Sequence, residues 1–149
     1  MTYLFLIASA VIIIDRIVKF LVYNNLLEGR SIEIIPKAFY LTLVLNTGAA
    51  FGLLKDRNQF FIAASFIVIA LVILYVWAGR QKDLFVLSAL GLILGGAVGN
   101  LIDRLIFGYI IDFLDFRIWP VFNIADSSIT VGSVLLIMRV LFNKRCCTQ

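Results

Sequence analysis

Two stretches of this chain carry no charged residue over a length that can cross a lipid bilayer. They are Phe60–Ala78 and Leu84–Ile102, each 19 residues long. A transmembrane helix needs about 20 predominantly apolar residues, because each residue adds about 1.5 Å to a path of about 30 Å. The second stretch also contains four glycines, which give it a face of small residues suited to close helix packing. Both stretches therefore predict membrane-spanning helices.

Two further segments predict spanning helices although they carry charge. Thr2–Val22 is apolar except for three charged residues, and a segment from about Ile124 to Phe142 has Arg139 near its end, where a long side chain can reach the interface. With 62% hydrophobic residues and a mean hydropathy of +1.05, the 149-residue chain falls in the integral membrane class. We expect one membrane domain over residues 1–149: an all-α membrane protein with four transmembrane helices and a small extracytoplasmic β-sheet.

The basic residues predict how these helices are oriented. The short linker Gly79–Asp83 and the C-terminal tail both contain basic residues, and short loops rich in lysine and arginine lie on the cytoplasmic side. Both termini are then cytoplasmic, and the linkers 23–57 and 103–121 lie outside. The N-terminus lacks a basic leader region, so we expect the first helix to be retained. The net charge of +4 is explained by basic residues that orient the helices in the membrane, so we expect no nucleic-acid partner.

The outer linkers contain extended segments. Ser31–Ile35 and Phe39–Asn46 flank a turn, and apolar residues alternate along the second of them, which predicts a β-hairpin. Tyr109–Phe116 predicts another strand, with Asp112 on one edge of the sheet. The turn Asn46–Gly52 is rich in glycine and alanine, but it lacks the lysine of a phosphate-binding loop and can be an ordinary turn.

Two aspartates stand close to apolar residues. Asp112 lies between isoleucine and phenylalanine, and Asp126 lies at the start of the fourth predicted helix. An ionisable residue near the apolar layer is costly and therefore suggests a function. Two carboxyl groups that share one site can activate water without a metal, one protonated and the other ionised. The chain has no histidine, and its cysteines are only the adjacent Cys146 and Cys147, so we expect no metal site.

Simpler structural interpretations exist for the polar residues. Asn123 and Asp126 have the spacing of an N-cap and a first-turn acid of a helix. Asp112 can be a solvated loop residue. The helix dipole disfavours an anion at the end of the third helix, so we expect Asp103 and Arg104 to form interfacial ion pairs.

The first helix offers a further pair. Asp15 and Lys19 are separated by four residues and can neutralise each other. Structural pairing is the favoured interpretation, while a serine–lysine protease with Lys19 as the base stays open. Asn100, one turn deeper than Arg104, can hydrogen-bond near the proposed site.

Four motifs in order along the chain resemble those of one family, the bacterial lipoprotein signal peptidases, also called signal peptidase II. These motifs are DRIVK at 15–19, NTGAAFG at 46–52, GNLIDRLIFGYIIDF at 99–113 and FNIAD at 122–126. One such motif is a weak signal, but four in this order on a four-helix chain of this length are specific.

The resemblance implies a membrane aspartyl endopeptidase that removes the signal peptide from diacylglyceryl-modified prolipoproteins, cleaving before the lipidated cysteine. It implies that Asp112 and Asp126 are the catalytic pair and that no cofactor is needed. The substrate-binding positions that it implies are Asn46, Asn100, Arg104 and Asn123. It also implies that the enzyme contacts membrane lipids in the bacterial cytoplasmic (inner) membrane, with its site at the outer face. We expect a monomer.

Two hypotheses from other classes remain open. A small proton-coupled transporter or channel subunit could relay protons through Asp15, Asp103 and Asp112. This hypothesis predicts carboxylates at several membrane depths, whereas most carboxylates of this chain lie at the ends of the predicted helices. A structural membrane subunit, with charges that serve only topology, gives no reason for two aspartates on the same face.

Overall fold

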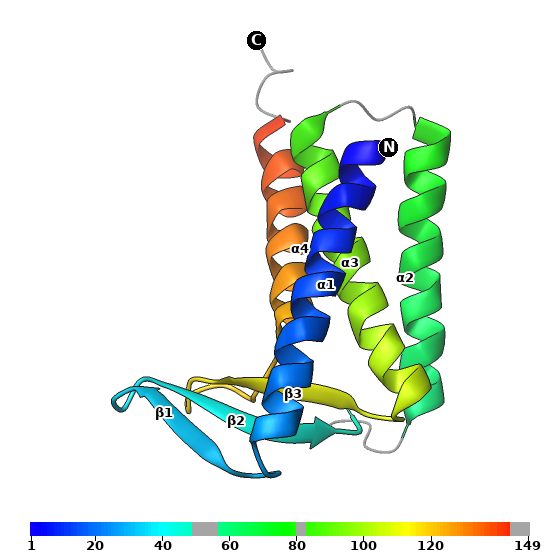
Figure 1. Cartoon of the computed structure of the whole chain (residues 1–149). Helices are drawn as coiled ribbons and strands as arrows, with labels where there is room; N and C mark the ends of the chain where they lie inside the picture. Colours follow the sequence, from blue (N-terminus) through cyan, green and yellow to red (C-terminus); the bar gives the residue numbers. More distant parts are fainter. Residues whose placement is uncertain (49–56, 80–82, 144–149) are drawn as a thin grey trace.

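The computed structural model describes residues 1–48, 57–79 and 83–143. Four helices stand side by side, and a three-stranded sheet extends sideways from one end of them (Figure 1). The helices are α1 (Thr2–Asn25), α2 (Asn58–Gly79), α3 (Leu84–Ile106) and α4 (Ile124–Asn143). The strands are β1 (Ser31–Ile35), β2 (Phe39–Asn46) and β3 (Ile110–Asp115).

Helix α3 is the centre of the bundle and packs against α1, α2 and α4. Its predicted face of small residues makes this possible. A Cβ added at Gly95 would lie 2.8 Å from the backbone oxygen of Ala8 on α1, and one added at Gly96 would collide with Ala125 on α4. The backbones of three helices therefore approach one another at contact distance around these two glycines.

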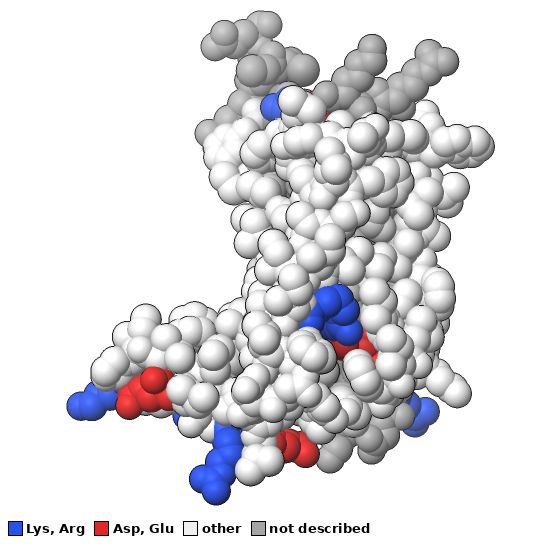
Figure 2. Space-filling view, in the orientation of Figure 1, with Lys and Arg blue, Asp and Glu red and all other residues white. Residues whose placement is uncertain are grey.

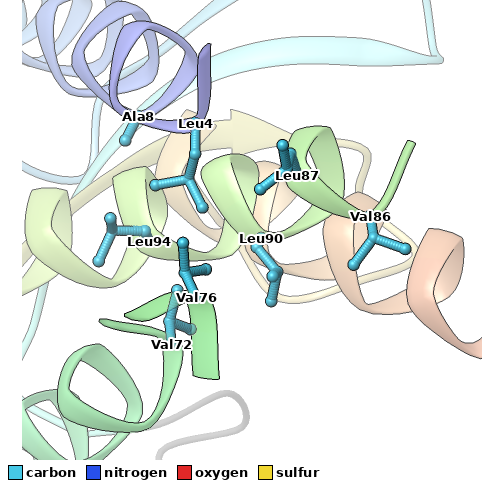
Figure 3. Close-up of a cluster of buried hydrophobic side chains, with 8 residues drawn as sticks. All are labelled: Leu4, Ala8, Val72, Val76, Val86, Leu87, Leu90 and Leu94. Atoms are coloured by element: carbon cyan, nitrogen blue, oxygen red, sulfur yellow. The ribbon is translucent and has the colours of Figure 1, made fainter. Parts of the chain in front are cut away.

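Buried apolar side chains fix the helices at the end away from the sheet. Leu4 on α1, Val72 and Val76 on α2, and Leu90 and Leu94 on α3 belong to one cluster, and the side chains from α1 and α2 point toward α3 (Figure 3). A second buried cluster, which includes Val22, Leu43 and Phe113, packs the sheet against the last turns of α1.

By length and composition, three of the described helices can cross a membrane: α2, α3 and α4. Helix α1 has 24 residues, or about 36 Å, but three charged residues interrupt its apolar sequence. On the face that Figure 2 shows, the surface over the helices is mostly uncharged apart from one basic and acidic group in its lower half, and other acidic and basic side chains gather at the end with the sheet. This distribution is typical of a bundle surrounded by lipid, with the sheet at one polar interface.

The predicted hairpin is confirmed, since β1 and β2 pair antiparallel with the expected boundaries. Strand β3 pairs antiparallel with β2 and forms the other edge of the sheet, so the placing of Asp112 on an edge strand is also confirmed. Asp112 lies opposite Val44, and Ile110 lies opposite Asn46. This register sets the end of β2 beside the segment that carries Asp112.

Candidate active site

The structure brings Asp112 and Asp126 into one hydrogen-bonded group. Asn123 lies between them: its Nδ2 donates to Asp112 Oδ1 at 2.6 Å, and its backbone N–H lies 3.4 Å from Asp126 Oδ2. Asn123 is completely buried, and Asp112 is 2% exposed. One asparagine therefore fixes the relative positions of two acids that come from a strand and a helix.

Two more amides hold the outer oxygens of the aspartates. Asn46 at the end of β2 donates through Nδ2 to Asp112 Oδ2 at 2.9 Å, and Asn100 on α3 donates through Nδ2 to Asp126 Oδ1 at 2.7 Å. The expectation that Asn100 hydrogen-bonds near the site is confirmed. The three asparagines from the resemblance thus surround both carboxyl groups.

The start of α4 fixes the direction of the Asp126 side chain. Asn123 Oδ1 accepts from the backbone N–H of Asp126 at 2.9 Å, while Asp126 Oδ2 faces the backbone N–H of Asn123, as in a reciprocal capping box. The predicted capping role is confirmed, and it coexists with membership of the site. Asp15 on α1 adds a third anchor, because its Oδ1 accepts from the backbone N–H of Ala125 at 3.1 Å.

A buried ionic cluster lies behind the asparagines. Lys19 Nζ is 2.8 Å from Asp15 Oδ2, 2.7 Å from Asp103 Oδ2 and 3.2 Å from Asn100 Oδ1. The predicted pairing of Asp15 with Lys19 is confirmed. Asp103 also pairs with Arg16, so its arginine partner comes from α1. Lys19 is here a cation paired with two carboxylates and a donor to the amide oxygen of Asn100, which does not suit the base that a serine–lysine protease requires.

The contacts of Arg104 differ from the predicted interfacial ion pair. Within the part of the chain that the structure describes, it forms no ion pair with a carboxylate. Its guanidinium instead donates to the backbone oxygen of Gly48 at 2.9 Å and to Asn58 Oδ1 at 3.1 Å, and it stacks over the ring of Phe61. The helix end directs Asp103 and Arg104 to opposite sides, so that Asp103 meets α1 and Arg104 meets α2.

Burial and charge alter the ionisation of Asp112. Burial, followed by the nearby negative charge of Asp126, raises the pKa of Asp112 to about 7, although hydrogen bonds from Asn46 and Asn123 partly oppose the increase. Near neutral pH this carboxyl group therefore populates its protonated and ionised forms to similar extents. One acid of the pair can hold a proton while the other accepts one.

A cavity of about 460 Å³ opens onto the two aspartates. It lies between α2, α3 and α4, and the segment after β3 closes one side. Polar groups line the part next to the aspartates, and apolar side chains of α2 and α4 line much of the remainder. The lining of the cavity includes Asn46, Asn100, Arg104, Asp112, Trp119 and Asp126.

Sequence reasoning missed two residues that contact Arg104, namely Asn58 and Phe61. Both stand at the start of an apolar helix, where an amide and an aromatic ring are ordinary, so no signal in the sequence separated them from a helix end. Part of the NTGAAFG motif, the linker residues 80–82 and Cys146–Cys147 lie outside the described residues.

Comparison with known proteins identifies the family of this chain. The sequence pattern of the family described as signal peptidase (SPase) II matches residues 7–142. A protein from Halothermothrix orenii named lipoprotein signal peptidase is 48% identical over 134 residues, which cover 90% of this chain and 92% of that protein. A protein of the same name from Desulfitobacterium hafniense is 49% identical over 133 residues, covering 89% and 88%.

Solved structures are similar over nearly the whole chain. One, described as a bacterial membrane enzyme, superposes with a TM-score of 0.92 at 35% identity and covers 97% of this chain and 90% of its own. A second with the same description gives a TM-score of 0.87 at 36% identity, covering 95% and 94%.

Proposed function

Because this chain belongs to the signal peptidase II family, and is thus an aspartic endopeptidase that removes signal peptides from prolipoproteins, we propose that Asp112 and Asp126 are its catalytic pair. The observation that carries this assignment is the bridge through Asn123, which holds both carboxyl groups at the wall of one cavity. Asn46, Asn100 and Asn123 position the pair, and Arg104 lines the same cavity and contacts the substrate.

The two acids have different protonation states in this proposal. Burial and the charge of Asp126 raise the pKa of Asp112 to about 7, so a large fraction of Asp112 is protonated near neutral pH, and this protonated form is the active one. Asp126 stands in the first turn of α4, where the helix dipole favours a negative charge, and Asn100 donates to one of its oxygens. Asp126 is therefore the base and Asp112 the acid.

Hydrolysis then follows from proton transfers between these groups and the substrate. Asp126 takes a proton from water as the water oxygen adds to the scissile carbonyl carbon, and Asp112 gives its proton to the carbonyl oxygen. In the second step Asp126 passes its proton to the leaving nitrogen. Asp112 recovers a proton from the tetrahedral intermediate as the C–N bond breaks, so the pair returns to its starting state.

The cavity suits a substrate that arrives from within the membrane. The side chains of Phe61, Ala64 and Val68 on α2 form an apolar wall on the way to the aspartates. We propose that α1 also spans the membrane, giving four spans with both termini cytoplasmic. The site then lies at the outer face of the bacterial cytoplasmic membrane, in a single monomeric domain in contact with lipids.

The transporter hypothesis lacks comparable support. A proton relay needs carboxylates at successive depths, whereas Asp15 and Asp103 are both bound to Lys19, which itself contacts Asn100. These acids form one connected group beside the site. They do not form a path along the bundle.

A cleavage assay tests the proposed function. Purified protein in lipid nanodiscs is incubated with a diacylglyceryl-modified prolipoprotein, and the released signal peptide is measured by mass spectrometry. The matched control is the same prolipoprotein without the lipid. We expect cleavage before the lipidated cysteine only, without inhibition by a chelator or by a serine-directed reagent. Equal cleavage of both substrates, or loss of activity with either inhibitor, would oppose the proposal.

A further inference from the structure

The side chain of Arg104 is an unusual buried cation. It is 4% exposed and ends α3 at the edge of the cavity. Across residues 1–48, 57–79 and 83–143, no carboxylate lies within ion-pairing distance of it, and the groups that accept its hydrogen bonds are a backbone oxygen and an amide oxygen. Neutral acceptors orient a guanidinium without cancelling its charge.

The Asn58 side chain bonds both the guanidinium and the backbone oxygen of Arg104. Its Oδ1 accepts from Arg104 Nη1 at 3.1 Å, and its Nδ2 donates to the backbone oxygen of Arg104 at 3.2 Å. That backbone oxygen is one of the carbonyl groups left without an intrahelical donor at the C-terminus of α3. One amide thus fixes the tip of the side chain relative to its own backbone, and restricts the rotation of a long, flexible side chain.

Phe61 limits the remaining freedom. The guanidinium carbon lies 4.2 Å from the centre of the Phe61 ring, one turn after Asn58 on α2. The ring covers one face of the guanidinium and favours its positive charge. With Gly48 accepting from Nη2, the plane of the group is held by contacts on two edges and one face.

We propose that Asn58 is a positioning residue that holds Arg104 against the substrate, an inference that rests on the proposed function. Arginine has five N–H donors, and the described contacts use two. In the proposal, donors that these described contacts leave unused bind carbonyl oxygens of the substrate beside the scissile bond. A charge fixed in advance stabilises negative charge as it develops on such an oxygen, and a misplaced donor loses most of this effect. Asn58 therefore acts through Arg104 and does not itself react.

A double-mutant cycle tests this role. Asn58→Ala, Arg104→Lys and the double variant are compared with the parent by kcat/KM on lipidated prolipoprotein, normalised to the folded fraction. Gln59→Ala is the matched control, because this neighbouring amide is exposed. Asn58→Ala should lower kcat/KM at least about tenfold in the parent and less than about twofold when Arg104 is already lysine. Losses that multiply independently would overturn the proposal.

Asn58→Asp tests whether the acceptor must be neutral. It keeps an oxygen for Arg104 Nη1, but its carboxylate neutralises the guanidinium, and it loses the donor to the backbone oxygen of Arg104. The proposal therefore predicts that Asn58→Asp lowers kcat/KM at least as much as Asn58→Ala, with a melting temperature no lower than that of Asn58→Ala. A kcat/KM near that of the parent in Asn58→Asp would overturn the proposal.

Asp112→Asn provides the reference that separates this proposal from the proposed function. Full activity in that variant would refute the catalytic pair. Independent losses at Asn58 and Arg104, in an enzyme that Asp112→Asn inactivates, would refute only the positioning role.

Discussion

Gly96 allows a direct test of how closely α4 must approach α3. Gly96→Ala adds a single methyl group, whose carbon would lie 2.7 Å from Ile129 Cγ1 and nearer still to the backbone oxygen of Ala125. Ordinary contact begins at 3.4 Å, so α4 must move by about 1 Å to accept the methyl group. Ala125 directly precedes Asp126, and the movement therefore displaces one acid of the proposed pair.

The expected effects on stability and on activity differ in size. Overpacking a core costs about 1–3 kcal/mol, and replacing a helical glycine by alanine returns about 1 kcal/mol. The net loss of at most about 2 kcal/mol leaves most molecules folded. A displacement of about 1 Å at a reacting group, in contrast, can reduce the rate on the order of a hundredfold. Activity should therefore fall much more than thermal stability.

The assay measures two quantities for each variant in nanodiscs: kcat/KM on lipidated prolipoprotein and the melting temperature. Gly79→Ala is the matched control, because a Cβ at this helical glycine would meet nothing within 4 Å, and it should keep the activity of the parent. Activity near that of the parent in a correctly inserted Gly96→Ala protein would refute the argument that helix spacing sets the position of Asp126.

Three further predictions concern charge and topology. Asp15→Asn and Lys19→Ala should damage folding or membrane assembly more than chemistry, since each leaves the buried ionic cluster with one charge in excess, at a cost of up to about 3–5 kcal/mol. Normal protein amounts and melting with activity lost would contradict this. Because burial and the charge of Asp126 raise the pKa of Asp112 to about 7, the folded protein binds more protons than the unfolded chain between pH 4 and 7, so this group's contribution to stability falls as pH rises through that window. The activity should also decline above about pH 7, and Asp112→Asn should flatten the dependence of the melting temperature on pH; a parent melting temperature that rises from pH 5 to 8 as steeply as that of the variant would oppose this. For topology, Gln81→Cys should resist an impermeant thiol reagent applied to intact cells, and labelling from outside would exclude cytoplasmic termini.

The sequence was sufficient for the local elements. Phe39–Asn46 alternates apolar and polar residues, and the strand has these boundaries. The glycines of α3 predicted close packing, and Gly95 and Gly96 lie at its contacts with α1 and α4. Asn123 and Asp126 predicted a helix start, which depends only on neighbouring residues. In each case the signal and its structural consequence are close in the chain.

Partners far apart in the chain were not predictable in the same way. Asp103 pairs with Arg16, 87 residues away, and the prediction that Arg104 forms an ion pair was wrong for the described residues. Both outcomes depend on which side of α3 faces α1 and which faces α2. Hydrophobic periodicity does not resolve this on a helix that is buried on most sides. The role proposed for Asn58 was hidden for the same reason.

The central claim is that Asp112 and Asp126 together hydrolyse the substrate, and single-turnover kinetics with Asn variants test it most directly. Asp112→Asn and Asp126→Asn preserve side-chain volume, and each should lower the rate of signal-peptide release by several orders of magnitude while binding and melting temperature are retained. Asp115→Asn is the control, since Asp115 is a buried acid on the same strand that bonds Thr42 at 2.7 Å. It should cleave near the parent rate. Near-parent cleavage by a correctly inserted Asp112→Asn or Asp126→Asn protein would contradict the account.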